Sequence, residues 1–270
     1  MIGRWLPLTV MLLWALAALF GGSLSAGADS VQLEHILEGP GAAGLLGFDD
    51  LGRPVLQRLL AGASSAFAVS VGVVSISLLL GTAIGLTGAY QRGWLDLLIV
   101  RVIDIFMAFP GILLAIALAG VMGPGLDNLI IALTLVGWVG YARLVRGQVL
   151  SLRERDHVTA AVALGSSRWF ILTRHLLPLL AAPLIVEATF GIAGMVIAEA
   201  GLSFLGLGIQ PPHASWGSMI RDGTAYMLMA PHLVLAPGIA MLLVVLSLNL
   251  LGDRLRDRLD IRGVTARRRS

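Results

Sequence analysis

Long apolar stretches separated by short charged segments dominate the chain. A helix needs about 20 mostly apolar residues to cross roughly 30 Å of hydrocarbon. Six intervals of suitable length and polarity lie at about 5–22, inside 58–92, and at about 97–121, 126–142, 178–201 and 231–251. The pattern predicts an all-α integral membrane protein with about six transmembrane helices.

Prolines and glycines add local detail to these spans. Pro178 suits the first turn of the fifth span, because a helix start leaves its N–H groups unpaired and proline has none. Pro110 removes a backbone hydrogen bond and should kink or interrupt the third span. Gly81 and Gly85 form a pair of small residues four apart, which is typical of closely packed membrane helices.

The first apolar interval has two interpretations. Arg4 precedes it and small residues follow at 23–28, so the pattern fits a retained helix and also a cleaved signal peptide. The run is long for the apolar core of a signal peptide, which favours retention, but both interpretations stay open.

Composition agrees with the membrane class and excludes several kinds of chemistry. Hydrophobic residues make up 57% of the chain and charged residues only 13%. All 19 basic residues are arginine, so a nucleotide-binding P-loop, which needs a lysine, is absent, and no basic soluble domain suggests nucleic acid as a partner. There are no cysteines, and the five histidines form no HExxH pair. We therefore expect no catalytic residues, no cofactor, no metal site and no enzyme activity.

Arginine placement predicts the orientation, because positively charged loops stay on the cytoplasmic side. With the N-terminus inside, only Arg53, Arg58 and Arg221 of the 19 arginines fall outside. The loop at 143–177 and the tail at 253–270 are then cytoplasmic. The chain is then expected to cross its membrane several times, with both termini in the cytoplasm.

The loop at 143–177 has a helical pattern of its own. Asp156 or His157 can begin a short helix, and Gly165-Ser166-Ser167 ends it before a second helix that carries Trp169. Leu177-Pro178 should then turn the chain into the fifth span. Four small or apolar residues fall at i, i+3, i+4 and i+7 on one face of the first helix, namely Val158, Ala161, Val162 and Gly165. Such a helix-turn-helix fits a docking element, and it also fits an amphipathic loop resting on lipid headgroups.

The residues of this loop carry a resemblance to a known family. The pattern Thr159-Ala160-Ala161-x3-Gly165-x9-His175-x-Leu177-Pro178 resembles the EAA loop of ATP-binding-cassette (ABC) importer permeases, which docks on an ATPase subunit. The resemblance implies coupling roles for a set of residues in this chain, namely Thr159, Ala160, Ala161, Leu164, Gly165, Leu177 and Pro178. Thr159 stands where the family pattern has glutamate, so a salt bridge from that position is not implied.

Three further stretches are similar to the second membrane subunit of dipeptide, oligopeptide and nickel permeases. They lie at 47–54, at 199–217 and at 249–260, although Phe48 and Pro54 depart from the first pattern. The resemblance implies a MetI-like transmembrane fold and half of a heterodimeric pore that imports peptides, nickel or a related small solute. It also implies four kinds of partner, namely a second permease subunit, two cytoplasmic ABC ATPases that hydrolyse the ATP, an extracytoplasmic substrate-binding protein and the lipid bilayer.

The expected domain organisation follows from these elements. Residues 1–65 form an N-terminal transmembrane helix with an external segment, and residues 66–252 form the permease transmembrane domain, which includes the loop at 143–177. Residues 253–270 form the C-terminal tail.

Carboxylates within the spans suggest an alternative function. Asp104, Glu187 and Glu199 lie at or near membrane depth, where charge is costly, and together they fit a proton-coupled secondary transporter. A simpler interpretation pairs Asp104 with Arg101 and places Glu199 at the outer water boundary. Glu187 has no partner within its span, so it is expected to face a translocation path or a partner subunit.

Overall fold

The computed structural model describes residues 2–25 and 27–267, with side chains described for 5–21, 25 and 27–259. Helices make up almost all of its secondary structure, and the one β-bridge in the described part joins Phe48 to Pro54. The main helices are α1 (Ile2–Leu24), α2 (Val55–Gln91), α3 (Gly93–Met107), α4 (Gly111–Met122), α5 (Leu126–Leu152), α6 (Asp156–Ala163), α7 (Arg168–Phe170), α8 (Leu177–Phe204), α9 (Trp216–Thr224) and α10 (His232–Arg267). Two short segments complete the order, the 3₁₀-helix η1 (Leu33–His35) and the π-helix η2 (Ile171–Leu176).

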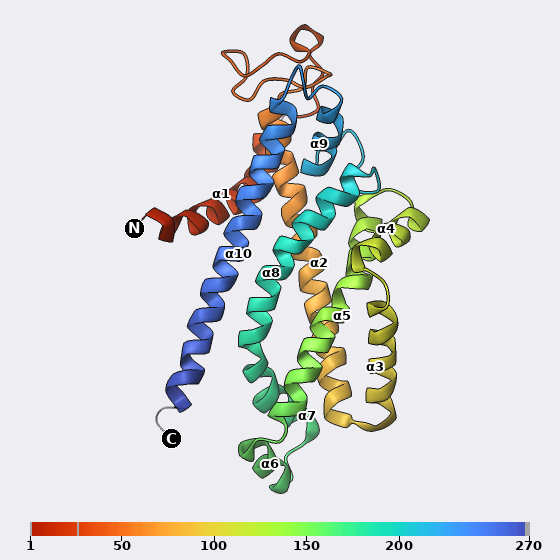
Figure 1. The fold of residues 1–270 in the computed structure, drawn as a ribbon, viewed down its shortest axis with the longest axis vertical. Coiled ribbons are helices and arrows are strands. Elements are labelled where there is room, and N and C mark those ends of the chain that lie inside the picture. Colours follow the sequence, from red (N-terminus) through yellow and green to blue (C-terminus); the bar gives the residue numbers. More distant parts are fainter. Residues whose placement is uncertain (1, 26, 268–270) are drawn as a thin grey trace.

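The long helices α2, α5, α8 and α10 run along the long axis of the molecule, whereas α1 crosses beside them (Figure 1). One end of the bundle carries the segment 27–54 and α9, and we call it the α9 end. The other end carries α6, α7 and the turn between α2 and α3, and we call it the α6 end. The segments on either side of each span therefore alternate between the two ends, as expected for a multi-pass membrane protein.

Four helical stretches are long and apolar enough to cross a membrane, namely Val55–Gln91, Leu126–Leu152, Arg168–Phe204 and His232–Leu259. A fifth candidate is the pair α3 and α4, whose axes bend by 85°. The described apolar part of α1, Trp5–Gly21, is shorter. The helical membrane class is confirmed, while the number of six spans stays a prediction.

The interruption of the third span is confirmed at the expected proline. Pro110 precedes the first residue of α4 in extended backbone, with φ −58° and ψ 121°. A proline has no N–H to continue the helix, so α3 ends at Met107 and α4 leaves in a new direction.

Several helices extend beyond the ends predicted for them from the apolar runs. α5 runs on from Ala142 to Leu152, and α2 begins before Arg58. The turn expected at Leu177-Pro178 is absent, because α7, η2 and α8 form one unbroken helical stretch. Its π-helical part ends at Leu176, two residues before Pro178. Apolar runs mark the hydrocarbon thickness, whereas helices continue beyond it into polar surroundings.

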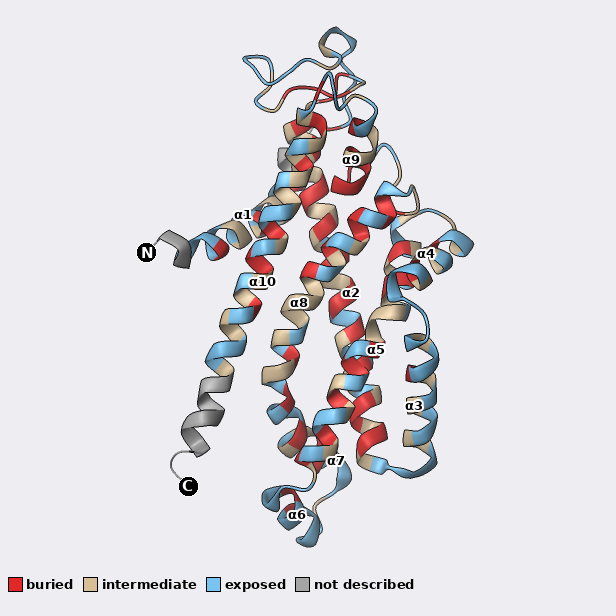
Figure 2. Ribbon diagram, viewed as in Figure 1, coloured by how far each residue is buried: buried red, intermediate tan, exposed pale blue. Residues whose placement is uncertain are grey.

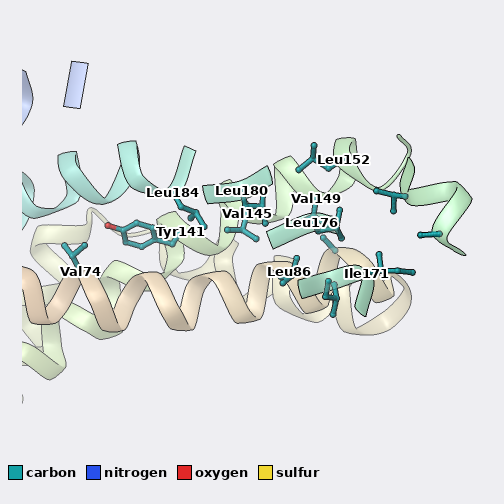
Figure 3. Packing of buried hydrophobic residues seen from close by; sticks show 14 residues of the cluster. Val74, Leu86, Tyr141, Val145, Val149, Leu152, Ile171, Leu176, Leu180 and Leu184 are labelled. Atoms are coloured by element: carbon teal, nitrogen blue, oxygen red, sulfur yellow. The ribbon is translucent and has the colours of Figure 1, made fainter. Parts of the chain in front are cut away.

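Close packing of α2 on α5 organises the middle of the bundle. A Cβ added at Gly81 would lie 2.6 Å from the Trp138 carbonyl oxygen, and one at Gly85 would lie 2.5 Å from that of Ala142. The predicted close approach at this glycine pair is confirmed. Towards the α6 end, Tyr141, Val145 and Val149 pack between α2 and α8 in one hydrophobic cluster (Figure 3).

Candidate functional site

The segment between α5 and α7, residues 153–167, forms a loop around α6 at the tip of the bundle (Figure 1), and we call it the α6 loop. The Arg155 carbonyl accepts the N–H groups of Val158 and Thr159 at the start of α6. Gly165, with φ +77°, ends the helix in left-handed backbone that suits glycine, and the Ser166 N–H donates back to the Ala161 carbonyl. Ser167 then caps α7 by accepting the Phe170 N–H at 3.3 Å. The predicted helix start and break are both present.

The α6 loop is fixed to the rest of the chain at its base. The Arg153 guanidinium donates to the carbonyl oxygens of Ala89 and Tyr90, at 3.1 and 3.3 Å, near the C-terminal end of α2. Cations are favoured there because the last carbonyls of a helix lack backbone partners. An exposed ion pair between Arg92 and Glu154, at 3.1 Å, lies beside it.

One side of α6 is buried against the chain itself. Val158 is 1% exposed and Ala161 is 7% exposed, and both belong to the hydrophobic cluster that contains Ile171 and Leu176 of η2. The single docking face expected from the spacing is therefore wrong, because Val158 and Ala161 pack inward while Val162 and Gly165 are exposed. A short amphipathic helix buries its apolar side on the nearest apolar surface, and here that surface is η2.

The opposite side of the α6 loop is free and partly apolar (Figure 2). Leu164 is 86% exposed at its tip, and Thr159, Ala160 and Gly165 are exposed beside it. The Thr159 hydroxyl donates to the Arg155 carbonyl at 3.2 Å, so it is occupied within its own helix. Leu164 and its three exposed neighbours together form the free surface of the α6 loop.

Two predicted residues lie apart from α6 in sequence and in secondary structure. Leu177 is 38% exposed and Pro178 is exposed, and both belong to the first turn of α8 and not to a turn between helices. Aromatic contacts connect the two parts, since the rings of His157 and His175 stack with centroids 6.0 Å apart and Phe170 packs edge-on against His175 at 5.6 Å. α6 and η2 therefore form one packed unit.

Glu187 is exposed on α8 and lines a cavity of about 650 Å³ between α5, α8 and α10, which we call the α8–α10 cavity. The residues lining this cavity are Leu144, Gln148, Leu152, Arg155, Leu179, Ala182, Pro183, Val186, Glu187, Phe190, Arg256 and Leu259. Among the described side chains, none forms an ion pair with Glu187 within 4.0 Å. The cavity thus contains one carboxylate and two guanidinium groups, those of Arg155 and Arg256.

The other two carboxylates are not where the sequence suggests. Asp104 is exposed in a separate cavity beside Arg143 and Arg146, and no ion pair within 4.0 Å joins it to Arg101 in the described part of the chain. Glu199 is 0% exposed, so its expected place at a water boundary is wrong. The Ser203 hydroxyl donates to Glu199 Oε1 at 2.8 Å. Asp104, Glu187 and Glu199 lie in three different surroundings, so they do not form a chain of groups that could pass a proton.

Burial of Glu199 follows from the way α9 packs on α8. A Cβ at Gly217 would lie 2.0 Å from the Ala200 carbonyl oxygen, so only glycine permits this contact. Ser215 caps α9 by accepting the Ser218 N–H at 3.1 Å, and both serines are buried. The returning helix covers the end of α8 and excludes water from Glu199.

A charge network at the α9 end escaped the sequence-based prediction. Asp49 accepts the backbone N–H groups of Leu51 and Arg53 and pairs with the Arg53 guanidinium at 2.7 Å. Arg58, which is 4% exposed, lies 3.4 Å from the same carboxylate through its Nε. Two left-handed glycines, Gly47 at φ +75° and Gly52 at φ +69°, turn the chain around this network. The clustered opposite charges at 49, 50 and 53 were the available signal.

Asp50 lies beside this network in less favourable surroundings. Burial raises the pKa of the Asp50 carboxyl, the negative charges of Asp49 and Asp222 raise it further, and the positive charge of Arg53 acts in the opposite direction. No group of three or more potential metal ligands occurs among the described side chains. The network therefore connects the segment that contains Asp50 to α2 through Arg58, and Asp222 of α9 is close enough to act on Asp50 electrostatically.

Comparisons with known proteins agree with this architecture. Residues 77–262, more than half of the chain, match the family described as binding-protein-dependent transport system inner membrane component. A glutathione transport system permease protein of Pectobacterium atrosepticum is 41% identical over 84% of this chain and 75% of its own length. A dipeptide transport system permease protein of Alkalihalophilus pseudofirmus is 44% identical over 83% of this chain and 74% of its own length.

Two further similarities extend over more of the chain or concern the fold. A putative peptide transport system permease protein of Brucella suis is 44% identical over 94% of this chain and 86% of its own length. A solved structure of the MetNI methionine ABC transporter in an inward-facing conformation superposes with a TM-score of 0.63. That match covers 75% of this chain and 96% of the solved chain at 19% identity, so it shows the fold alone.

These findings support a transport pore and give no support to the proton-coupled alternative. An ABC importer permease works with ATPase subunits and a solute-binding protein, and its apolar helices place it in the inner membrane. The chain belongs to the family of binding-protein-dependent transport system inner membrane components.

Proposed function

We propose that the protein forms one half of a heterodimeric pore that imports small peptides into the cytoplasm. ATP hydrolysis by two partner ATPases drives the cycle, and an external binding protein delivers the solute. The peptide class is supported by relatives named for glutathione, dipeptide and peptide transport. In this proposal residues 66–252 form the permease domain and residues 253–270 form a cytoplasmic tail.

The proposed orientation places the α6 end in the cytoplasm. Arginines are concentrated towards that end, from Arg143 to Arg174 and from Arg254 to Arg258, while Arg53, Arg58 and Arg221 lie towards the α9 end. Positive charge on the retained side supports this assignment. The C-terminal tail is then cytoplasmic, and residues 27–54 and α9 face the binding protein. We assign the N-terminus to the cytoplasm as well, because Arg4 precedes the first apolar run.

The α6 loop is the proposed contact with an ATPase. The observation that carries this assignment is the 86% exposure of Leu164 at the tip of a loop whose other side is buried. We assign the contact surface to Thr159, Ala160, Leu164 and Gly165, which are exposed together. Ala161, in contrast, connects α6 to η2, so a displacement of the contact surface is transmitted to α8 through packed side chains.

The test replaces contact residues without disturbing the buried side. Leu164→Arg and Ala160→Arg should each weaken ATPase association by about tenfold or more, as expected for central interface positions. Gln91→Arg is the matched control, because Gln91 is also exposed at the α6 end but lies outside the loop. Co-purification of the ATPase, solute-stimulated ATP hydrolysis and the amount of protein in the membrane are measured for each variant. Full association and transport in both loop variants contradict the proposal.

A further inference from the structure

Two cavities lie on the same face of α8. The α8–α10 cavity is lined by α8 residues at 179, 182, 183, 186, 187 and 190, and a second cavity of about 510 Å³ is lined by 194, 195, 197, 198 and 201. Each of these positions has another of the set three or four residues away, so they form one stripe along the helix. On α5, Leu133 and Val136 line the second cavity and Leu144 and Gln148 line the first. The α5–α8 face thus contains a hollow in each half of the bundle.

The two hollows differ in chemistry. The second cavity, between α4, α5 and α8, is lined by apolar side chains and by Gly111, Gly194 and Gly201. The α8–α10 cavity, nearer the α6 end, contains Gln148, Arg155, Glu187 and Arg256. Arg155, Glu187 and Arg256 are all exposed, and the two arginines lie beyond the apolar part of the helices, so water reaches these charges and a charged ligand can replace it. A lipid acyl chain satisfies neither sign.

We propose that the α8–α10 cavity is a solute subsite for an amphoteric molecule that carries an ammonium group and at least one carboxylate. Glu187 binds the ammonium group, and Arg155 and Arg256 bind carboxylate. Two guanidinium groups against one carboxylate leave an excess positive charge, so a solute with a second carboxylate binds better than one with a single carboxylate. This inference rests on the proposed transport function and specifies the solute class within it.

The position of Arg155 connects the subsite to the α6 loop. Its side chain lines the cavity, while its backbone carbonyl accepts the first N–H groups of α6. A displacement of α6 by an ATPase therefore moves one of the two solute-binding guanidiniums. This arrangement gives the α6 loop a direct route to the solute, in addition to the packing through Ala161.

The absence of cysteine in the sequence allows a direct test with single-cysteine variants. Ala182→Cys places a reporter on the cavity wall, and Ile185→Cys, at a position that is exposed on α8 but outside the cavity lining, is the matched control. The complete importer is reconstituted in nanodiscs without the binding protein, so that only the pore selects among solutes. The rate of thiol modification by a small water-soluble maleimide is measured for both variants.

Four dipeptides then serve as probes of the subsite, namely Ala-Glu, Ala-Ala, Ala-Lys and N-acetyl-Ala-Ala amide. We expect Ala-Glu to slow modification of the Ala182→Cys variant most and the doubly blocked peptide to have no effect. Differences of about two- to fivefold are expected between successive probes, the range given by one partly solvated ion pair. In the Ala182→Cys background, Glu187→Gln should weaken protection by Ala-Ala, and Arg256→Gln should remove the preference of Ala-Glu over Ala-Ala.

Three results overturn the proposal. They are equal modification of the Ala182→Cys and Ile185→Cys variants, equal protection by all four peptides, and protection that follows the anionic lipid content of the nanodisc and not the peptide. Solute-stimulated ATP hydrolysis in the parent importer is measured in parallel with the binding protein present. If the peptides stimulate ATP hydrolysis but do not protect the cysteine, the subsite is wrong and the transport function stands. If they do not stimulate ATP hydrolysis, the transport function itself fails.

Discussion

Replacement of Gly85 by alanine tests the packing that holds α2 against α5. The added Cβ would lie 2.5 Å from the Ala142 carbonyl oxygen, 3.1 Å from Val145 Cβ and 3.2 Å from the Ala142 carbonyl carbon. The nearest atom belongs to the backbone and cannot rotate away. An ordinary carbon–oxygen contact is about 3.3–3.6 Å, so the two helices must separate locally by nearly 1 Å.

The expected change in unfolding free energy combines a destabilising and a stabilising contribution. Overpacking in a close-packed core costs about 1–3 kcal/mol. Alanine is a better helix former than glycine by about 0.8–1 kcal/mol, which offsets part of that cost. Ala142 and Val145 are both 0% exposed, so little free space is available for relaxation and the upper part of the range applies. We expect a net loss of about 1–2 kcal/mol of unfolding free energy.

The assay is thermal unfolding of the detergent-purified protein at a fixed heating rate, followed by the fraction that stays monodisperse. About 1 kcal/mol corresponds to about 2–4 °C for a chain of this size, so Tm should fall by about 2–8 °C. Gly72→Ala is the control on the same helix, because a Cβ there has no atom within 4 Å. A Tm for Gly85→Ala equal to or above that of Gly72→Ala refutes the inference that backbone contact at this glycine stabilises the helix pair.

Three further predictions concern charged and polar contacts. The raised pKa of Asp50 means that the folded chain favours the neutral carboxyl, so its stabilising contribution is present at acid pH and lost as pH rises through that pKa. Asp50→Asn should therefore protect the 27–54 segment from limited proteolysis at neutral pH and have no effect below about pH 4. Ser203→Ala removes a hydrogen bond to a buried carboxylate and should cost about 1–3 kcal/mol in the thermal assay, but less in a Glu199→Leu background. Arg146→Gln breaks the two hydrogen bonds of 2.8 and 2.9 Å to Asp96, so Tm should fall, and Asp96→Asn should restore part of the loss.

Local sequence patterns predicted much of the architecture. Apolar runs located the helices, because their length is set by the membrane and not by a particular partner. Pro110 marked a break that any helix must show, since proline lacks an N–H. Gly165-Ser166-Ser167 marked the end of α6 and the start of α7, because left-handed backbone and capping are local properties.

Helix ends were predicted less well than helix positions. α5 continues through Arg143 to Leu152, and α7, η2 and α8 pass Pro178 without a turn. Hydropathy falls where a helix leaves the hydrocarbon, whereas backbone hydrogen bonding does not stop there. A π-helical stretch ends two residues before Pro178, and no residue pattern announced it.

The sequence by itself determined a helical membrane protein, the arginine-rich segments and the existence of α6, because each depends on composition or on neighbours a few residues away. Only the tertiary structure decided that Ala161 packs inward while Leu164 is free, since η2 supplies the surface that α6 covers. The same holds for the burial of Glu199 under α9 and for the cavity that brings Glu187 together with Arg155 and Arg256. These contacts join residues distant in the chain. They depend on the shape and charge of surfaces that form only when the helices pack together, so no single segment of sequence specifies them.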